Sequence, residues 1–216
     1  MSNLLVLTFR DLWYFIKKPV ELKQVRIPLK VKIGTCLALF IIQIPPLLGL
    51  SALLGGLEIL GLWEDDMHRL QKIFKEMKPG LIFFFAVIIA PFLEEIMFRL
   101  GLKLRSNFLI LWPLQLLILL QVSNKINLLK TIRNFWNKFY AWIFYLITIA
   151  FGLIHILNFK PSLNIYLLAP VLVAPQILIG INLGYLRIRF GLIWSILFHA
   201  FYNGILLSIA LLTGEI

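Results

Sequence analysis

Among the ionisable and amide side chains inside otherwise apolar stretches of the sequence, six stand out by their type and spacing. They are Glu94, Glu95, Arg99, His155, His199 and Asn203. Carboxylates and imidazoles can exchange protons with a reacting group or bind a metal ion. A charged side chain at the centre of a membrane helix costs about 2.5 to 3.5 kcal/mol, whereas a leucine returns only about 0.3 to 0.6 kcal/mol. Because packing alone does not require such groups, we interpret all six as functional candidates.

Spacing along a helix separates the two adjacent glutamates. Glu95 and Arg99 are four residues apart, so they share one helix face and can form an ion pair. Glu94 points about 100° away from Glu95, which predicts that it faces a cavity. Arg99 compensates the charge of Glu95, and Glu94 keeps a tunable proton affinity that suits a general base. Pro91 removes one backbone hydrogen bond nearby and is predicted to make room for water beside Glu94.

Each of these residues also has a purely structural interpretation. Glu95 and Arg99 suit a salt bridge near a helix end, with Arg99 extended to the membrane surface. His155 suits an interfacial histidine, and His199, which is four residues before the amide, suits interhelical hydrogen bonding. Glu94 is the hardest to explain structurally, because no nearby cation is left to pair with it.

The sequence leaves a metal site open. The zinc-protease pattern His-Glu-x-x-His, which places both histidines on one helix, is absent. A mixed site formed by Glu94, His155 and His199 suits zinc. Cys36 is the single cysteine, which excludes an intramolecular disulfide bond and a zinc site built from several thiolates.

Long apolar segments must position these residues. Hydrophobic residues make up 61% of the chain and charged residues 14%, and the mean hydropathy is +0.92. The composition predicts an all-α, polytopic transmembrane bundle of about six spans, and of up to eight if further helices lie in the N-terminal third. The six segments are 31–54, 79–100, 107–122, 139–158, 164–186 and 191–212. Pro45 and Pro46 are predicted to interrupt the regular helical hydrogen bonding of the first of them.

The N-terminal region is expected to form a separate segment. Residues 1–30 are predicted to contain an amphipathic helix at the membrane interface that ends before Pro19, and residues 31–216 to form the bundle. The core that carries the polar stretches is expected at about 79–212. A basic N-terminal block predicts a cytoplasmic N-terminus. With six spans, the three motif-bearing helices would run in the same direction, and the basic loop 125–138 would lie on the opposite side.

The formal net charge of +11 does not indicate nucleic-acid binding. The basic residues form short clusters between apolar segments, which is typical of helix ends that face lipid headgroups. Membrane lipids are therefore the expected partners, and a nucleic acid is not.

The polar stretches together resemble the CPBP family of intramembrane proteases. This family, also called Abi, contains CAAX proteases, bacteriocin-processing proteases and the Ras-converting prenyl-protein endopeptidases. Its signature is Glu-Glu-x-x-x-Arg, Phe-x-x-x-His and His-x-x-x-Asn, each on its own transmembrane helix. The matching residues are Glu94, Glu95, Arg99, Phe151, His155, His199 and Asn203. One departure is that Leu100 separates the motif arginine from Gly101.

The resemblance implies an endopeptidase that hydrolyses a peptide bond with activated water. Glu94 would be the general base, and His155 would hold the water. His199 and Asn203 would stabilise the oxyanion, while Glu95 and Arg99 would orient the site. The resemblance implies no obligatory metal cofactor, with zinc left open.

The expected substrate is a membrane-associated peptide or a lipidated protein, cleaved in CAAX-type or leader-peptide processing. The cytoplasmic membrane of a prokaryote is the expected location of this multi-pass protein. Two other functions were weighed: a non-catalytic immunity or binding protein of the same family, and a proton-coupled transporter. Transporters commonly contain internal repeats and paired broken helices, neither of which is clear in this sequence.

Overall fold

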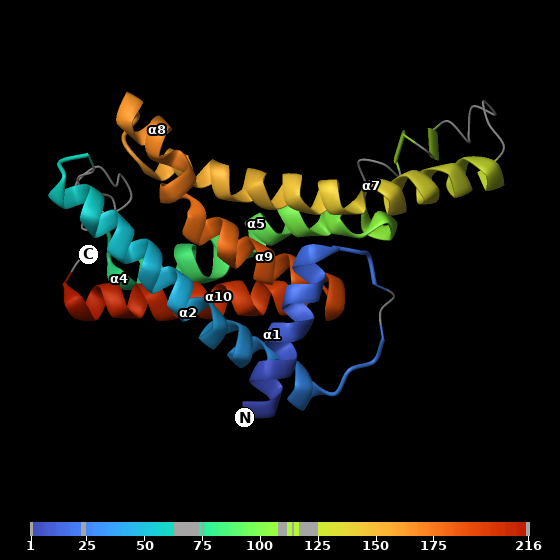
Figure 1. Ribbon diagram of the computed structural model, residues 1–216, viewed down its shortest axis with the longest axis horizontal. Helices are drawn as coiled ribbons and strands as arrows, with labels where there is room; N and C mark the ends of the chain where they lie inside the picture. The colour runs from blue at the N-terminus through green and yellow to red at the C-terminus, as the bar shows by residue number, and fades with distance from the viewer. Residues whose placement is uncertain are drawn as a thin grey trace.

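The computed structural model describes residues 2–22, 25–62, 74, 76–107, 112–113, 115–116 and 125–214. The regular elements in these ranges are helices (Figure 1). They are α1 (Ser2–Lys17), α2 (Leu29–Ile59), α4 (Pro79–Phe83), the π-helix η2 (Phe84–Ile89), α5 (Ala90–Arg99), the short η3 (Leu100–Leu102) and η4 (Leu104–Ser106), α7 (Lys125–Ile154), η5 (His155–Asn158), α8 (Leu163–Leu172), α9 (Ala174–Arg189) and α10 (Leu192–Thr213).

Five stretches of the described chain are long and apolar enough to cross a membrane. They are Leu29–Ile59, Pro79–Leu102, Leu128–Asn158, Leu163–Arg189 and Leu192–Thr213. The predicted all-α, polytopic bundle is therefore confirmed. Five of the six predicted segments correspond to these stretches, and the remaining one, 107–122, lies largely outside the described residues.

The first crossing is one continuous helix, and Pro45 and Pro46 lie inside it, where their missing N–H groups interrupt the regular hydrogen bonding without breaking the helix. Each proline removes one backbone donor, but α2 extends over 31 residues and keeps its hydrogen bonds on both sides of the pair. In a bilayer the other backbone groups have no water to bond, so the helical conformation remains the favourable one.

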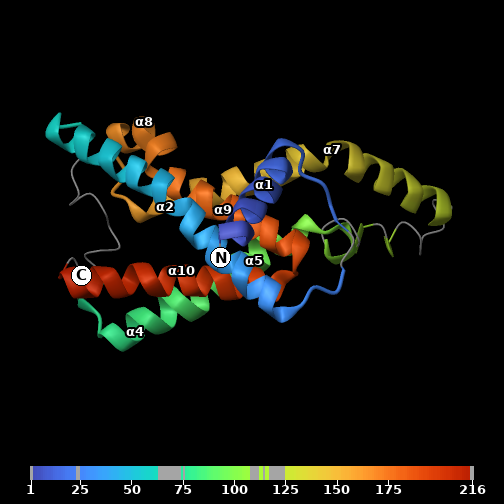
Figure 2. The ribbon, with the colours of Figure 1, turned by 60° about the horizontal axis from the view of Figure 1, so that its bottom comes forward.

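The central helix of the bundle is α9, which packs against α7, α10 and α2. Figure 2 shows α10 with α4 on one side and α2 with α8 on the other. Most residues of α9 from 179 to 188 are buried. The chain turns from α9 into α10 at Gly191, whose φ of 105° favours glycine. This turn places the two helices side by side.

The relative directions of the membrane-crossing helices differ from those of the six-span prediction. In Figure 1, α5 and α9 end at the end of the bundle where α2, α7 and α10 begin. Lys32 lies 5.3 Å from the centre of the Trp194 ring, which joins the starts of α2 and α10. The prediction that the three motif-bearing helices run in the same direction is therefore wrong: α5 runs opposite to α7 and α10. The two ends of the chain segment between α5 and α7 lie at the same end of the bundle.

We call this end of the bundle the basic end. It carries Lys17, Lys18, Lys30, Lys32, Lys103, Arg105, Lys130, Arg133, Lys138, Arg187 and Arg189. Among the described residues, the other end carries Glu58, Glu76, Lys78 and Lys160. The basic stretch that begins α7 thus lies at the same end as the basic N-terminal region, and not on the opposite side as six spans would require. Burial, followed by the nearby Arg187 guanidinium, lowers the pKa of Lys103.

The N-terminal helix α1 is tied to the basic end. It ends at Lys17, as expected from Pro19. Phe15 is buried edge-on against Phe144 and Tyr185, and Asp11 forms an ion pair with Arg189 at 2.7 Å. The opposite face of α1 is exposed and contains several large apolar residues, Val6, Phe9, Trp13 and Tyr14 among them. Its position at a membrane interface stays a prediction.

Candidate active site

The helix that carries the two glutamates contains a π-helical turn just before them. The backbone N–H of Ala90 donates to the Phe85 carbonyl, five residues earlier. In the same pattern the Ala86 carbonyl would accept from residue 91, but Pro91 has no N–H. Asn203 of α10 supplies the missing donor, with its Nδ2 2.9 Å from the Ala86 oxygen. Pro91 does free a backbone group, as the sequence indicates, and a side chain from a neighbouring helix bonds it.

Glu95 and Arg99 form the predicted ion pair, and it is fully buried. Arg99 Nε lies 3.7 Å from Glu95 Oε1, with side-chain exposures of 1% and 0%. The interpretation that Arg99 extends to the membrane surface is wrong, because its guanidinium stacks 3.9 Å from the centre of the Phe151 ring. A side chain at Gly180 would require that ring to shift, since a Cβ atom would lie 3.0 Å from it.

Glu95 is also bonded from α10. His199 Nδ1 lies 3.1 Å from Glu95 Oε1, and the Ser195 hydroxyl donates to the other carboxylate oxygen. Ser195 is fully buried, and its oxygen lies 2.9 Å from the Leu183 carbonyl. Ser195 is not among the candidates that the sequence motifs single out. Its spacing of four residues before His199 is the signal that would have placed it on the same helix face.

Glu94 points in a different direction from Glu95, towards the imidazoles of His155 and His199. Its Oε2 lies 3.9 Å from His155 Nε2 and 3.8 Å from His199 Nε2. This oxygen is buried and has no hydrogen-bond partner among the described residues, while the side chain as a whole is 26% exposed. The two adjacent glutamates thus have different surroundings, as their angular separation predicts.

Hydrogen bonds at the far side of each ring orient the two histidines. His155 Nδ1 lies 2.7 Å from the Phe151 carbonyl, which can only accept a hydrogen bond. His199 Nδ1 faces the Glu95 carboxylate in the same manner. A proton on each Nδ1 leaves each Nε2 directed at Glu94. In the neutral rings, these Nε2 atoms are acceptors.

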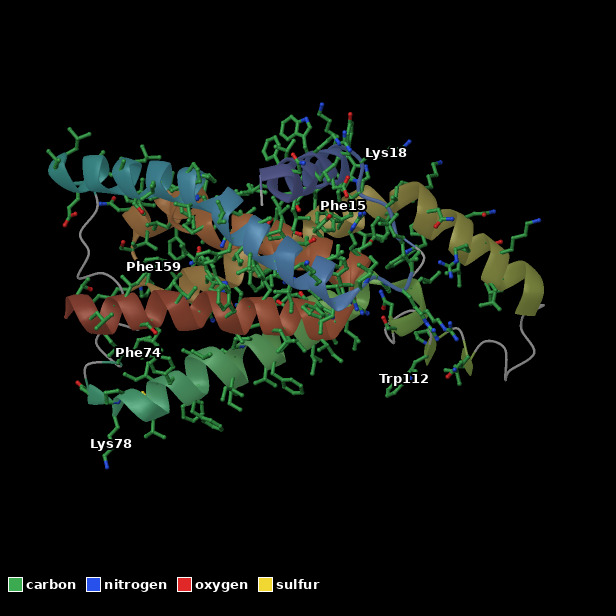
Figure 3. The ribbon with its side chains drawn as sticks, turned by 90° about the horizontal axis from the view of Figure 1, so that it is seen from below. Phe15, Lys18, Phe74, Lys78, Trp112 and Phe159 are labelled. Carbon is green, nitrogen blue, oxygen red and sulfur yellow. The ribbon has the colours of Figure 1, made fainter. Side chains whose placement is uncertain are left out.

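A cavity of about 590 Å³ joins these groups. Glu94, His155, His199 and Asn203 all line it, which confirms that Glu94 faces a cavity. Glu95 and Arg99 are not among its lining residues and lie behind the wall. The cavity extends to Phe74, which lies at the end of the bundle away from the basic end (Figure 3). The remaining wall is mostly aromatic and aliphatic.

A metal ion has a chemically suitable donor set in this wall. One carboxylate and two imidazoles, from Glu94, His155 and His199, match the ligand types of catalytic zinc sites. Within the described ranges, however, no group of three or more His, Cys, Asp or Glu residues is arranged so that it could hold a metal ion.

The segment from residue 77 to residue 205 matches the model of the type II CAAX prenyl endopeptidase Rce1-like family. This segment makes up more than half of the chain and contains the six candidate residues. The chain therefore belongs to that family of CAAX-type intramembrane endopeptidases, and the resemblance seen in the motifs is confirmed. Comparisons with curated proteins and with solved structures give no match.

Proposed function

We propose that this protein is an intramembrane endopeptidase that hydrolyses a peptide bond of a membrane-associated peptide or a prenylated protein. The observation that supports this most directly is the position of Glu94. Its carboxylate lines the cavity, has an oxygen without a hydrogen-bond partner among the described residues, and faces two imidazoles. A base beside a water-positioning group is what hydrolysis requires.

The attacking water would lie between Glu94 and His155. Glu94 Oε2 and His155 Nε2 are both acceptors, 3.9 Å apart. One water molecule about 2.8 Å from each atom can donate to both. Glu94 would take one proton as the water oxygen attacks the substrate carbonyl carbon, and His155 would hold the water in place.

The negative charge on the substrate oxygen would be stabilised from α10. Asn203 Nδ2 uses one N–H on the Ala86 carbonyl and has a second N–H to donate. His199 can donate from Nε2 when its ring is protonated, and this atom lies 3.8 Å from Glu94 Oε2. Two donors directed at one oxygen act as an oxyanion hole.

The steps balance without a further reactant. The water oxygen forms a bond to the carbonyl carbon, its proton passes to Glu94, and the carbonyl electron pair moves onto the oxygen. When this intermediate collapses, the C–N bond breaks and the proton on Glu94 passes to the leaving nitrogen. We propose that no metal ion is obligatory for these steps.

The proposal is tested by proteolysis in reconstituted vesicles. The substrate is a farnesylated peptide with a C-terminal CAAX sequence, compared with its unprenylated form. We expect Glu94→Gln to lower kcat by about 10²- to 10⁴-fold, the usual contribution of a general base. Glu58→Gln, on an exposed position of α2, is the matched control and should cleave normally.

Two further results would change the proposal. Loss of cleavage in a chelator, restored by zinc, would make Glu94, His155 and His199 metal ligands. If the wild type cleaves no peptide while Glu94→Gln keeps the cellular activity of the protein, a non-catalytic binding role replaces proteolysis.

A further inference from the structure

One polar residue of the cavity wall has no part in the proposed mechanism and yet has an unpaired atom. Gln176, in the first turn of α9, lines the cavity beside Pro175. Its Oε1 is buried and has no hydrogen-bond partner among the described residues. Such an acceptor is unfavourable unless something bonds it.

This feature distinguishes Gln176 from the other buried polar groups. In the described part of the chain, buried side-chain nitrogen or oxygen atoms without a hydrogen-bond partner occur on Gln43, Glu94, Arg99 and Gln176. Of these four residues, Glu94 and Gln176 line the cavity. Gln43 instead bonds Asn182 at 2.8 Å between α2 and α9, away from the cavity wall.

A bound peptide has a matching need. Its backbone N–H groups would enter a cavity whose wall is mostly apolar, including Phe85, Met97 and Leu206. A buried N–H without an acceptor costs about 1 to 3 kcal/mol. Glu94 and His155 are engaged with the water in the proposed mechanism, so they are not available to accept from the peptide.

We propose that Gln176 is a substrate-binding residue whose Oε1 accepts a hydrogen bond from a backbone N–H next to the scissile bond. This inference rests on the proposed function, because it assigns the second peptide contact of the same site. It identifies the ligand as an extended backbone with a free N–H at that position, whatever side chains flank it.

The test combines one side-chain substitution with one change in the substrate backbone. Gln176→Met keeps the size of the side chain and removes the amide, whereas Gln176→Glu keeps an acceptor. Gln115→Met, at an exposed position, is the matched control. The probes are the farnesylated CAAX peptide and two ester analogues, each with one N–H beside the scissile bond replaced by oxygen.

With wild-type protein, one of the two esters should raise KM about tenfold, the effect of one unpaired polar group. Gln176→Met should raise KM for the amide peptide by a similar factor, with kcat changed less than about twofold, and should show no further loss with that ester. Gln115→Met should behave as wild type. Equal sensitivity of wild type and Gln176→Met to both esters overturns the inference.

Binding separates this inference from the proposed proteolysis. The same peptides, carrying a fluorophore, are titrated into Glu94→Gln protein in vesicles with and without Gln176→Met. Binding that depends on Gln176, in a protein whose wild type cleaves nothing, would support the inference and refute the protease. If the wild type cleaves the peptide and binding is the same with and without Gln176→Met, the protease is supported and the inference is refuted. If no peptide binds, both are refuted.

Discussion

The residues behind the cavity wall form a buried charged cluster whose members depend on one another. Glu95 accepts from His199 and Ser195 and lies beside Arg99, and the exposures of Glu95 and Arg99 do not exceed 1%. A buried ion pair contributes little net stability, but the loss of one partner leaves an uncompensated charge. This cluster fixes the ring of His199, whose other nitrogen faces Glu94.

Removal of Glu95 should therefore destabilise the protein much more than removal of one partner of a surface ion pair. We expect Glu95→Ala to lower the free energy of unfolding by about 3 to 5 kcal/mol, because Arg99 remains buried and unpaired. Arg133→Ala is the control, since Arg133 is 49% exposed in its pair with Glu21 and should lose about 0 to 1 kcal/mol. Unfolding in mixed detergent micelles measures both, and equal losses would contradict the prediction.

Ser195 should behave as a positioning residue and not as a nucleophile. Ser195→Ala removes one hydrogen bond to Glu95, which corresponds to about 1 to 3 kcal/mol. We expect kcat to fall by roughly tenfold at unchanged KM, with a shifted pH profile. Complete inactivity of the variant, together with covalent labelling of the wild type by a serine-directed inhibitor, would instead indicate covalent catalysis.

At the residue scale, contacts within one helix could be predicted from the spacing of residues in the sequence, and contacts between helices could not. The interval of four residues predicted the pairing of Glu95 with Arg99, and the interval of one predicted that Glu94 faces elsewhere. The same interval relates Ser195 to His199 but does not reveal the bond of Ser195 to Glu95 on another helix, and Gln176 has no such spacing signal. Both residue types are ordinary in membrane helices, and their partners come from other parts of the chain or from a ligand.

At the scale of elements, the π-helix is coupled to α10 through one side chain. Pro91 leaves the Ala86 carbonyl without a backbone donor, and Asn203 bonds it at 2.9 Å. The same amide is a proposed oxyanion donor. Stability and activity can therefore be separated at this residue.

A double-mutant cycle makes the separation. We expect Asn203→Ala to destabilise the protein by about 1 to 3 kcal/mol, because a buried carbonyl loses its donor. In a Pro91→Ala background the backbone N–H of residue 91 can bond that carbonyl, so the loss should be clearly smaller. Cleavage should be impaired by Asn203→Ala in both backgrounds. An identical loss of stability in the two backgrounds would show that Pro91 and Asn203 are not coupled.

The two proline sites show why elements could be predicted only in part. Hydropathy identified the apolar helices that the structure describes. Pro45 and Pro46 lie inside a continuous helix, whereas Pro91 follows a π-helix that no pattern in the sequence predicts. A proline in the sequence indicates a missing backbone donor, but the conformation of the backbone there depends on the residues that pack around it.

On the scale of the whole molecule, the positive charge of the described residues is concentrated at one end. Hydropathy was sufficient for the fold class, but counting spans gave the wrong relative direction for α5. The structure places the basic N-terminal region and the start of α7 together, as the contact of Glu21 with Trp136 shows at 2.6 Å. An end rich in lysine and arginine is expected to face the cytoplasm. We propose this orientation, in the cytoplasmic membrane of a prokaryote.

Labelling of single cysteines tests the orientation. In a Cys36→Ser background, Lys160→Cys should react with a membrane-impermeant maleimide added outside intact cells. Lys138→Cys should react only after the membrane is opened, because both positions are exposed but lie at opposite ends of the bundle. The reverse pattern would place the basic end outside.

The cavity extends from Glu94 to Phe74, at the end opposite to the basic end (Figure 3). With the basic end in the cytoplasm, water and protons would reach Glu94 from the outer compartment. Such a protein would couple processing of its substrate to the chemistry of the environment and not to that of the cell interior.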